Sequence, residues 1–179
     1  NELIDSYKID EKKIEVIYPG VNENFWTSNS VRGTEKTMLK FGLPQKYILN
    51  VGSYYPRKNQ CTLIEAFDLI KNKVEDNLVL IGGVGNLRKK IEQLIQQKNL
   101  SRRVKIIPHI SNEDLQAVYR SASVFVFPSL YEGFGMPITE ALISKIPVIA
   151  TKGGCFEEAG GRNSLYINSS IAEEMAAQG

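Results

Sequence analysis

Residues Tyr131–Glu140, with the sequence YEGFGMPITE, have the form of a tight connection from a strand to a helix. The preceding block Ser123–Phe127 is apolar and rich in β-branched and aromatic residues, which is typical of a buried strand. Gly133 and Gly135 allow backbone angles that a Cβ disfavours, and Pro137 suits the first position of a helix. The stretch therefore predicts an elbow whose helix N-terminus attracts anions.

Two carboxylates, Glu132 and Glu140, flank this elbow. Carboxylates repel phosphate but accept hydrogen bonds from hydroxyl groups. A ligand that carries both phosphates and vicinal diols fits this combination, and a sugar nucleotide is the commonest such molecule. The alternative is an acid-flanked glycine turn in an ordinary α/β domain.

The composition is that of a soluble globular protein. A length of 179 residues indicates one domain, and 22 Lys and Arg against 20 Asp and Glu give no reason to expect nucleic acid or a strongly basic membrane surface as partner. Cys61 and Cys155 lie far apart without metal-type spacing, which favours free thiols in a reducing compartment over a disulfide. No signal peptide is visible, and no apolar run approaches the ~18 residues of a membrane span. Because the chain starts without Met, we expect a fragment of a longer protein.

The first third of the sequence is expected to be mostly connecting structure. A short helical piece precedes a predicted strand at Ile14–Tyr18, which Pro19-Gly20 ends. Residues 22–33 are polar apart from Phe25 and Trp26, and we expect a linker there.

From Tyr47 onward, short apolar runs alternate with amphipathic segments. This alternation predicts an α/β fold with a doubly wound, Rossmann-like parallel sheet covered on both faces. The predicted strands are Tyr47–Gly52, Leu78–Gly82, Val104–Ile107, Ser123–Phe127, Pro147–Ala150 and Leu165–Ile167. The predicted helices are Gln60–Lys73, Leu87–Lys98, Asn112–Ser121, Pro137–Ser144 and Ile171–Ala177.

Ligands of such sheets bind beyond the carboxyl ends of the strands, so the loops there carry the candidate site. The loop Gly52–Asn59, GSYYPRKN, places Arg57 and Lys58 before a helix. The pair suits a diphosphate, Arg57 as a planar fork and Lys58 as a point charge. The alternative is a pair of solvated surface charges.

Two further loops give weaker signals. Gly82-Gly83-Val84-Gly85 resembles part of a dinucleotide fingerprint, but Arg88 stands where its third glycine belongs. His109, the only histidine, has no carboxylate or serine partner in the sequence pattern, which favours a surface or stacking role over catalysis.

The elbow also carries a family resemblance. Glu132, Gly133, Phe134, Gly135 and Pro137, followed by Glu140 and Ala141, resemble the E-x7-E signature of retaining GT-B glycosyltransferases of the "group 1", family 4-like class. Matching motifs run in order from about Val16 to Ile167, including Pro19-Gly20-Val21 with Phe25 and the G-G-x-x-E of Gly153–Glu157. The resemblance implies the C-terminal half of a GT-B fold. Residues 1–33 would then be the end of an N-terminal domain with its linker, and residues 34–179 the nucleotide-sugar-binding domain.

The resemblance also implies roles for individual residues. Arg57 and Lys58 would neutralise the leaving diphosphate, and Glu132 would hold donor-sugar hydroxyls. These three are the expected catalytic residues, while Glu140 would hold the ribose. Further donor contacts are expected at Gly52, Ser53, Gly83, Gly85, His109, Gly133, Phe134 and Gly135. No metal ion and no cofactor besides the nucleotide sugar are implied.

Three positions depart from the family pattern. Ser53 stands where an arginine often sits, Pro108 where glycine usually contacts the base, and Lys145 where a glycine caps the helix in the left-handed conformation. Glu157 is interpreted as a structural carboxylate.

The expected function is transfer of a hexose from a nucleotide sugar, with retention, to a glycan or lipid-linked acceptor in polysaccharide biosynthesis. GDP-mannose is the first donor expected, and UDP-linked glucose or N-acetylglucosamine the next. The acceptor and any membrane contact would involve the missing N-terminal part, in a cytoplasmic protein that could sit at the inner membrane face. A sugar-nucleotide epimerase of GT-B architecture and a non-catalytic binding module remain alternatives, whereas a glycosidase would have no use for the basic loop.

Overall fold

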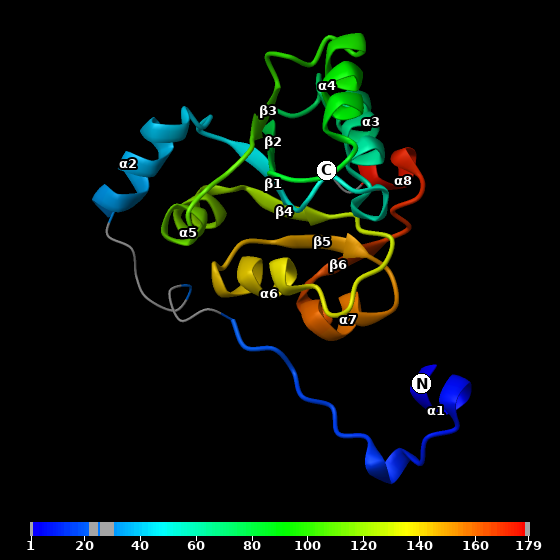
Figure 1. Cartoon of the computed structure of the whole chain (residues 1–179). Coiled ribbons are helices and arrows are strands. Elements are labelled where there is room, and N and C mark those ends of the chain that lie inside the picture. Colours follow the sequence, from blue (N-terminus) through cyan, green and yellow to red (C-terminus); the bar gives the residue numbers. More distant parts are fainter. Residues whose placement is uncertain (1, 22–24, 26–30, 178–179) are drawn as a thin grey trace.

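A single parallel sheet forms the centre of the computed structural model, which describes residues 2–21, 25 and 31–177 (Figure 1). The strand order is β3-β2-β1-β4-β5-β6, and every neighbouring pair is parallel. The strands are β1 Tyr47–Val51, β2 Asn77–Ile81, β3 Val104–Ile107, β4 Val124–Phe127, β5 Val148–Thr151 and β6 Leu165–Ile167. All six were expected from the sequence, with ends within one residue of those observed.

Both faces of the sheet are buried, because successive side chains of a strand point to opposite sides. In β4, Phe125 and Phe127 pack into one apolar cluster while Val126 packs into the other. Likewise, Leu49 and Ile48 of β1 belong to different clusters. A strand buried on both faces has little room for polar residues, which explains the continuous apolar runs in the sequence.

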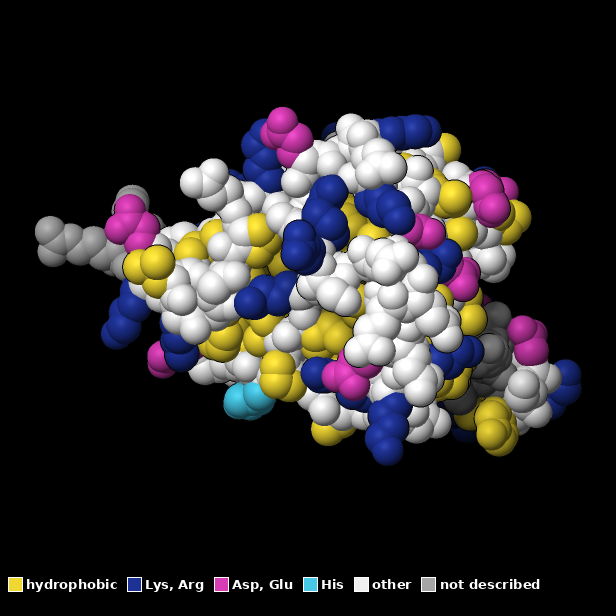
Figure 2. All heavy atoms as spheres, turned by 90° about the horizontal axis from the view of Figure 1, so that it is seen from above, with side chains coloured by type: hydrophobic (Ala, Val, Ile, Leu, Met, Phe, Trp, Pro, Cys, Tyr) yellow, Lys and Arg dark blue, Asp and Glu magenta, His cyan; other side chains and the backbone are white. Residues whose placement is uncertain are grey.

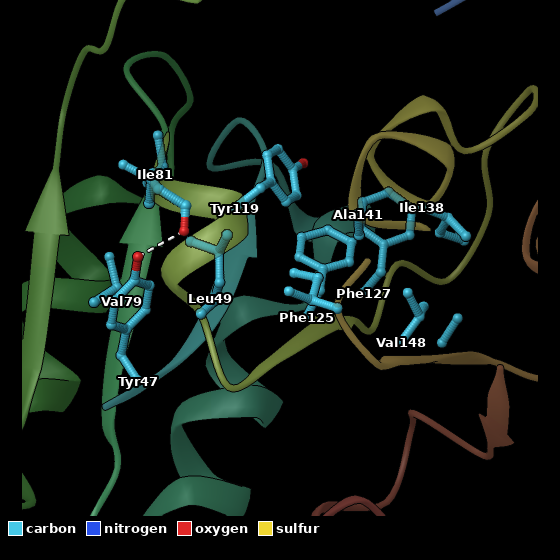
Figure 3. Packing of buried hydrophobic residues seen from close by; sticks show 14 of the residues in the cluster. Tyr47, Leu49, Val79, Ile81, Tyr119, Phe125, Phe127, Ile138, Ala141 and Val148 are labelled. Carbon is cyan, nitrogen blue, oxygen red and sulfur yellow. Dashed lines mark hydrogen bonds between the residues drawn. The ribbon is translucent and has the colours of Figure 1, made fainter. Parts of the chain in front are cut away.

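Helices cover each face, as a doubly wound fold requires (Figure 1). On one side the apolar cluster contains residues of α3 Gln60–Ile70, α4 Arg88–Gln97 and α8 Ala172–Ala176. On the other it contains residues of α2 Val31–Phe41, α5 Asn112–Ser121, α6 Met136–Ile143 and α7 Cys155–Gly160. Figure 3 shows how the aromatic residues of β4 meet α5 and α6 in this second cluster. The predicted Rossmann-like class is confirmed.

The N-terminal segment differs from the expectation. After the short helix α1 Glu2–Tyr7 and the 3-10 turn Glu11–Lys13, the predicted strand Ile14–Tyr18 is absent. Val16, Ile17 and Tyr18 are 69%, 82% and 56% exposed, and no described strand pairs with them. A strand is stable only when a neighbour accepts its backbone hydrogen bonds. The segment instead runs beneath α6 and α7 (Figure 1).

Helix α2 was not expected, because its start falls in the predicted linker. Residues 22–24 and 26–30 of that linker lie outside the described residues, and the predicted boundary between residues 33 and 34 falls inside α2. Met38 and Phe41 of α2 pack against the core. Thr37 donates a hydrogen bond to Asp114 of α5 at 2.8 Å. The division of the chain into two domains stays a prediction.

The surface carries mixed charge. On the face shown in Figure 2, Lys and Arg side chains are interspersed with Asp, Glu and apolar groups. None of the helices in the described part of the chain has the length and apolar character needed to cross a bilayer.

The end of α6 has the strained residue that the sequence suggested. Lys145 has φ 62°, in the left-handed region. Its N–H donates to Leu142 O at 3.0 Å, and the N–H of the buried Ile146 donates to Ala141 O at 3.3 Å. These two bonds form a Schellman motif, whose left-handed position is usually glycine.

We predict that Lys145→Gly raises the free energy of unfolding by about 1 kcal/mol, because a Cβ in the left-handed region costs roughly that amount. Urea denaturation of the purified chain measures the change. Lys145→Ala is the matched control, since it removes the long side chain but keeps the Cβ, and it should stay within about 0.5 kcal/mol of the parent. Equal stability of the two variants would contradict the strain.

Candidate functional site

The candidate site lies where the strand order reverses direction, between β1 and β4. Chains leave these two neighbouring strands in opposite directions along the sheet, which opens a crevice at their carboxyl ends. The loop after β1 contains the 3-10 turn η3 Pro56–Lys58, and the loop after β4 leads to the elbow before α6. A backbone hydrogen bond from Leu130 N to Arg57 O, 2.7 Å long, joins the two loops.

Glu132 lies between the two predicted cations. Its Oε2 is 2.6 Å from Arg57 Nη1, and its Oε1 accepts a short hydrogen bond from Lys58 Nζ. Burial alone would raise the pKa of Glu132, but the hydrogen bonds from Lys58 and Arg57 outweigh it and hold the pKa below its usual value. Glu132 therefore contacts both of the other residues expected to be catalytic, although it lies 74 residues from Lys58 in the sequence.

The surroundings hold both cations in place. Lys58 is only 8% exposed, and its ammonium group lies 5.1 Å from the ring centroid of Phe127. The guanidinium group of Arg57 lies 5.9 Å from the ring of Tyr131. Cations over aromatic faces are stabilised electrostatically. Lys58 is therefore a buried, paired cation rather than a solvated surface charge, and Arg57 is held by the same carboxylate.

A chain of hydrogen bonds runs beneath the site. Asn59, with φ 57°, donates from Nδ2 to Ser169 O at 2.7 Å. Thr151 Oγ1 lies 2.7 Å from Ser169 Oγ and 2.7 Å from Ser129 O. Asn59, Ser169 and Ser129 lie in the loops after β1, β6 and β4, and Thr151 is the last residue of β5, so the chain connects three loops and the end of a strand at the carboxyl edge of the sheet.

The elbow has the predicted form, with one small correction. Gly135 precedes α6 with φ 101°, and an added Cβ would lie 3.3 Å from Ile138 Cδ1. Pro137 is the second residue of α6 rather than the first, which still leaves its missing N–H within the turn where none is needed. Gly133 is exposed, and the ring of Phe134 packs against Tyr18 at 5.6 Å.

The second carboxylate, Glu140, lies inside α6 and is half-buried. It does not join the cluster around Glu132. Its Oε2 accepts a hydrogen bond of 3.0 Å from the hydroxyl of Tyr119 on α5. Burial raises the pKa of Glu140, and the bond from Tyr119 opposes that rise.

A groove of about 370 Å³ lies at the ends of β1, β2 and β3. It brings together four predicted donor contacts, namely Gly52, Ser53, Gly83 and His109. Backbone crowding explains the glycines here: a Cβ on Gly83 would lie 2.5 Å from Pro108 O. Gly85 has φ 137°, and a Cβ there would lie 2.2 Å from Tyr54 O.

A smaller pocket of about 160 Å³ adjoins Glu132 on the other side of the elbow. Its lining includes Lys152, Gly153, Gly154 and Cys155. Neither Lys152 nor Cys155 was predicted as a site residue from the sequence, although both border the two glycines. The thiol of Cys155 donates to Glu132 O at 3.3 Å.

Glu157 has the structural role that was expected, since its Oε1 accepts a hydrogen bond of 2.9 Å from Gly153 N. Among the described residues, no three His, Cys, Asp or Glu side chains come together as a metal site would require.

The chain is similar in sequence to known proteins. The family model described as glycosyl transferases group 1 matches residues 32–177. The chain is 31% identical over 172 residues to the O-antigen chain mannosyltransferase RfbU of Salmonella typhimurium, covering 94% of this chain and 44% of that protein. It is 30% identical over 135 residues to the O-antigen chain mannosyltransferase B of Escherichia coli, covering 74% of this chain and 35% of that protein.

A solved crystal structure has a fold similar to that of this chain. The crystal structure of a glycosyltransferase from Rickettsia africae matches with a TM-score of 0.90 and 26% identity, over 99% of this chain and 48% of that chain. The chain thus spans less than half the length of these relatives. By the extent of the family match, this chain belongs to the glycosyl transferases group 1.

Proposed function

We propose that this chain is the donor-binding half of a retaining hexosyltransferase that uses a nucleotide sugar. The observation that carries the proposal is the cluster of Arg57, Lys58 and Glu132 at the point where the strand order reverses. Two cations beside one carboxylate leave a positive charge that suits a diphosphate. The mannosyltransferases among the relatives favour mannose as the sugar, with GDP-mannose as donor. UDP-linked glucose or N-acetylglucosamine is the second candidate.

In this proposal, charge builds on the diphosphate as the bond to the sugar breaks. Arg57 and Lys58 are held in advance by Phe127, Tyr131 and Glu132, so they stabilise that charge without reorganisation of solvent. The helix N-terminus at Gly135 adds backbone N–H groups near the same place. No metal ion is required in this scheme.

The carboxylates would hold hydroxyl groups. Glu140 would accept from the ribose and Glu132 from the donor sugar, which would lie in the pocket of Lys152 and Cys155. The base would lie in the groove of Ser53 and His109. The acceptor would bind to a further part of the protein, and this part would also make any membrane contact. A cytoplasmic location stays a prediction.

The two alternatives differ in what they require of the site. An epimerase of GT-B architecture needs acid and base groups around the sugar, and the described lining of the pocket beside Glu132 offers Tyr131, Lys152 and Cys155 besides that carboxylate, but no histidine. A non-catalytic module would bind a nucleotide sugar without supporting transfer in any longer form of the protein. We expect the 179-residue chain to bind nucleoside diphosphates and to transfer no sugar by itself.

We predict that Lys58→Ala weakens binding of GDP or UDP by roughly 1–3 kcal/mol, the range for hydrogen bonds to charged groups. Isothermal titration calorimetry with both nucleotides measures the loss and identifies the base. Lys36→Ala, at an exposed position of α2, is the matched control and should leave affinity unchanged. The loss should shrink as salt is added. Unchanged affinity of Lys58→Ala would remove the basis of the proposed site.

Glu132 forms ion pairs with both cations in the free protein, and this gives a second prediction. A diphosphate has to replace the carboxylate on at least one of them. Glu132→Gln should therefore bind the bare nucleoside diphosphate about tenfold more tightly, or ~1.4 kcal/mol. The same variant should lose the additional affinity for the intact sugar nucleotide. If Glu132 served the sugar alone, affinity for the bare diphosphate would not change, and calorimetry with both ligands separates the two cases.

A further inference from the structure

Tyr119 lies in the buried layer beneath the elbow. It has no exposed surface, and its ring centroid is 5.8 Å from that of Phe25 and 5.3 Å from that of Phe125. Figure 3 shows it beside Phe125 and close to Ala141, the residue after Glu140. Aromatic neighbours on two sides leave the ring little freedom.

The hydroxyl of Tyr119 donates a hydrogen bond to Glu140. It has one proton to donate, and that proton goes to Glu140 Oε2 at 3.0 Å. Burial and the nearby charge of Glu140 raise the pKa of Tyr119 well above its usual value, so the phenol stays protonated at any working pH. The bond joins α5 to α6 through side chains alone.

Glu140 consequently has one oxygen held by the protein and one left over. No described residue donates a hydrogen bond to Oε1, and this atom is not among the buried side-chain atoms that lack a partner. Oε1 is therefore open to solvent or a ligand. A carboxylate fixed through one oxygen presents the other in a defined direction.

The bond from Tyr119 is also the main interaction that favours the charged form of Glu140. β4 and β5 carry no ionisable residue against α6, and α6 has no other. On α5, Asp114 pairs with Lys40 and Arg120 donates to Phe25 O. The remaining charged residues of α5 and α7, the two helices packed on α6, are Glu113, Glu157 and Glu158. All three are acidic and supply no positive charge, and Glu157 and Glu158 accept hydrogen bonds from Gly153 N and the Tyr18 hydroxyl respectively.

We infer that Tyr119 is a positioning residue of the donor site, which holds Glu140 charged and oriented so that its free oxygen accepts a hydrogen bond from a ribose hydroxyl. This inference rests on the proposed function, because the ribose contact of Glu140 belongs to it. Tyr119 itself touches no ligand.

The test is the pH dependence of nucleotide binding in Tyr119→Phe, which removes only the hydroxyl. Without its donor, the half-buried Glu140 takes up a proton at a higher pH than in the parent. The variant should therefore bind GDP or UDP about tenfold more weakly at acidic pH, and the difference should shrink as the pH rises and Glu140 becomes charged in both proteins. A loss of the same size at every pH would overturn the inference, because a merely structural defect has no reason to follow the charge of Glu140.

Two further variants test whether the effect of Tyr119→Phe acts through Glu140. Tyr47→Phe is the matched control, since Tyr47 is also fully buried in this cluster but donates to Val118 O, away from Glu140. Its affinity should equal that of the parent at each pH. In a Glu140→Gln background, Tyr119→Phe should add almost nothing to the loss. Additive losses in this double-mutant cycle would mean that Tyr119 acts independently of Glu140.

A titration of the free protein separates this inference from the proposed function. The carboxyl carbon of Glu140, followed by NMR with labelled glutamate, should titrate at a higher pH in Tyr119→Phe than in the parent or in Tyr47→Phe. An unchanged midpoint would overturn the role of Tyr119 whatever the protein binds. Equal affinity for a nucleoside diphosphate and its 2′,3′-dideoxy analogue would instead overturn the ribose contact of the proposed function.

Discussion

The carboxylate of Glu132, held between Arg57 and Lys58, joins the two halves of the sheet where a ligand would enter. The loop after β1 carries the two cations, and the loop after β4 carries the carboxylate. Each ion is costly to bury by itself, and Lys58 is nearly inaccessible to water. Pairing offsets part of that cost, and separating the pair would leave a buried charge without a partner, so the positions of the two loops depend on one another. The geometry of the candidate site is set by this mutual requirement before any ligand arrives.

Residues in the layers below contact the cluster and the loops that carry it. Phe127 supports Lys58 from the end of β4, and the chain through Asn59, Thr151 and Ser169 connects the surrounding loops. The same principle applies to Glu140, whose orientation depends on Tyr119 in the layer between sheet and helices. Groups that are fixed in advance bind and stabilise charge more effectively than mobile ones.

Much of the fold could be predicted from sequence because each buried strand and each amphipathic helix leaves a periodic pattern. Residues Ile14–Tyr18 had the pattern of a strand, but no strand in the described part of the chain pairs with them, which local sequence cannot reveal. Helix α2 was not predicted, because Gly33 and the polar residues before it have the composition of a linker. Its apolar face becomes apparent only where Met38 and Phe41 meet the core.

The site could be predicted in part for the same reason. Lys58 and Glu132 were recognisable because both follow strands, and parallel strands bring their carboxyl ends to one edge. Their direct contact was not predicted, because side-chain pairing across 74 residues leaves no periodic signal. Tyr119 was missed altogether: it occupies an ordinary apolar position of α5, and only the packing of α5 on α6 brings it to Glu140.

In the proposed complex, the two cations bind a diphosphate in place of Glu132. A crystal structure of the chain with bound GDP or UDP is the decisive measurement. We expect a phosphate oxygen within hydrogen-bond distance of Lys58 Nζ, with Glu132 released from at least one cation. A diphosphate bound elsewhere, with Glu132 still paired to both Arg57 and Lys58, would contradict it.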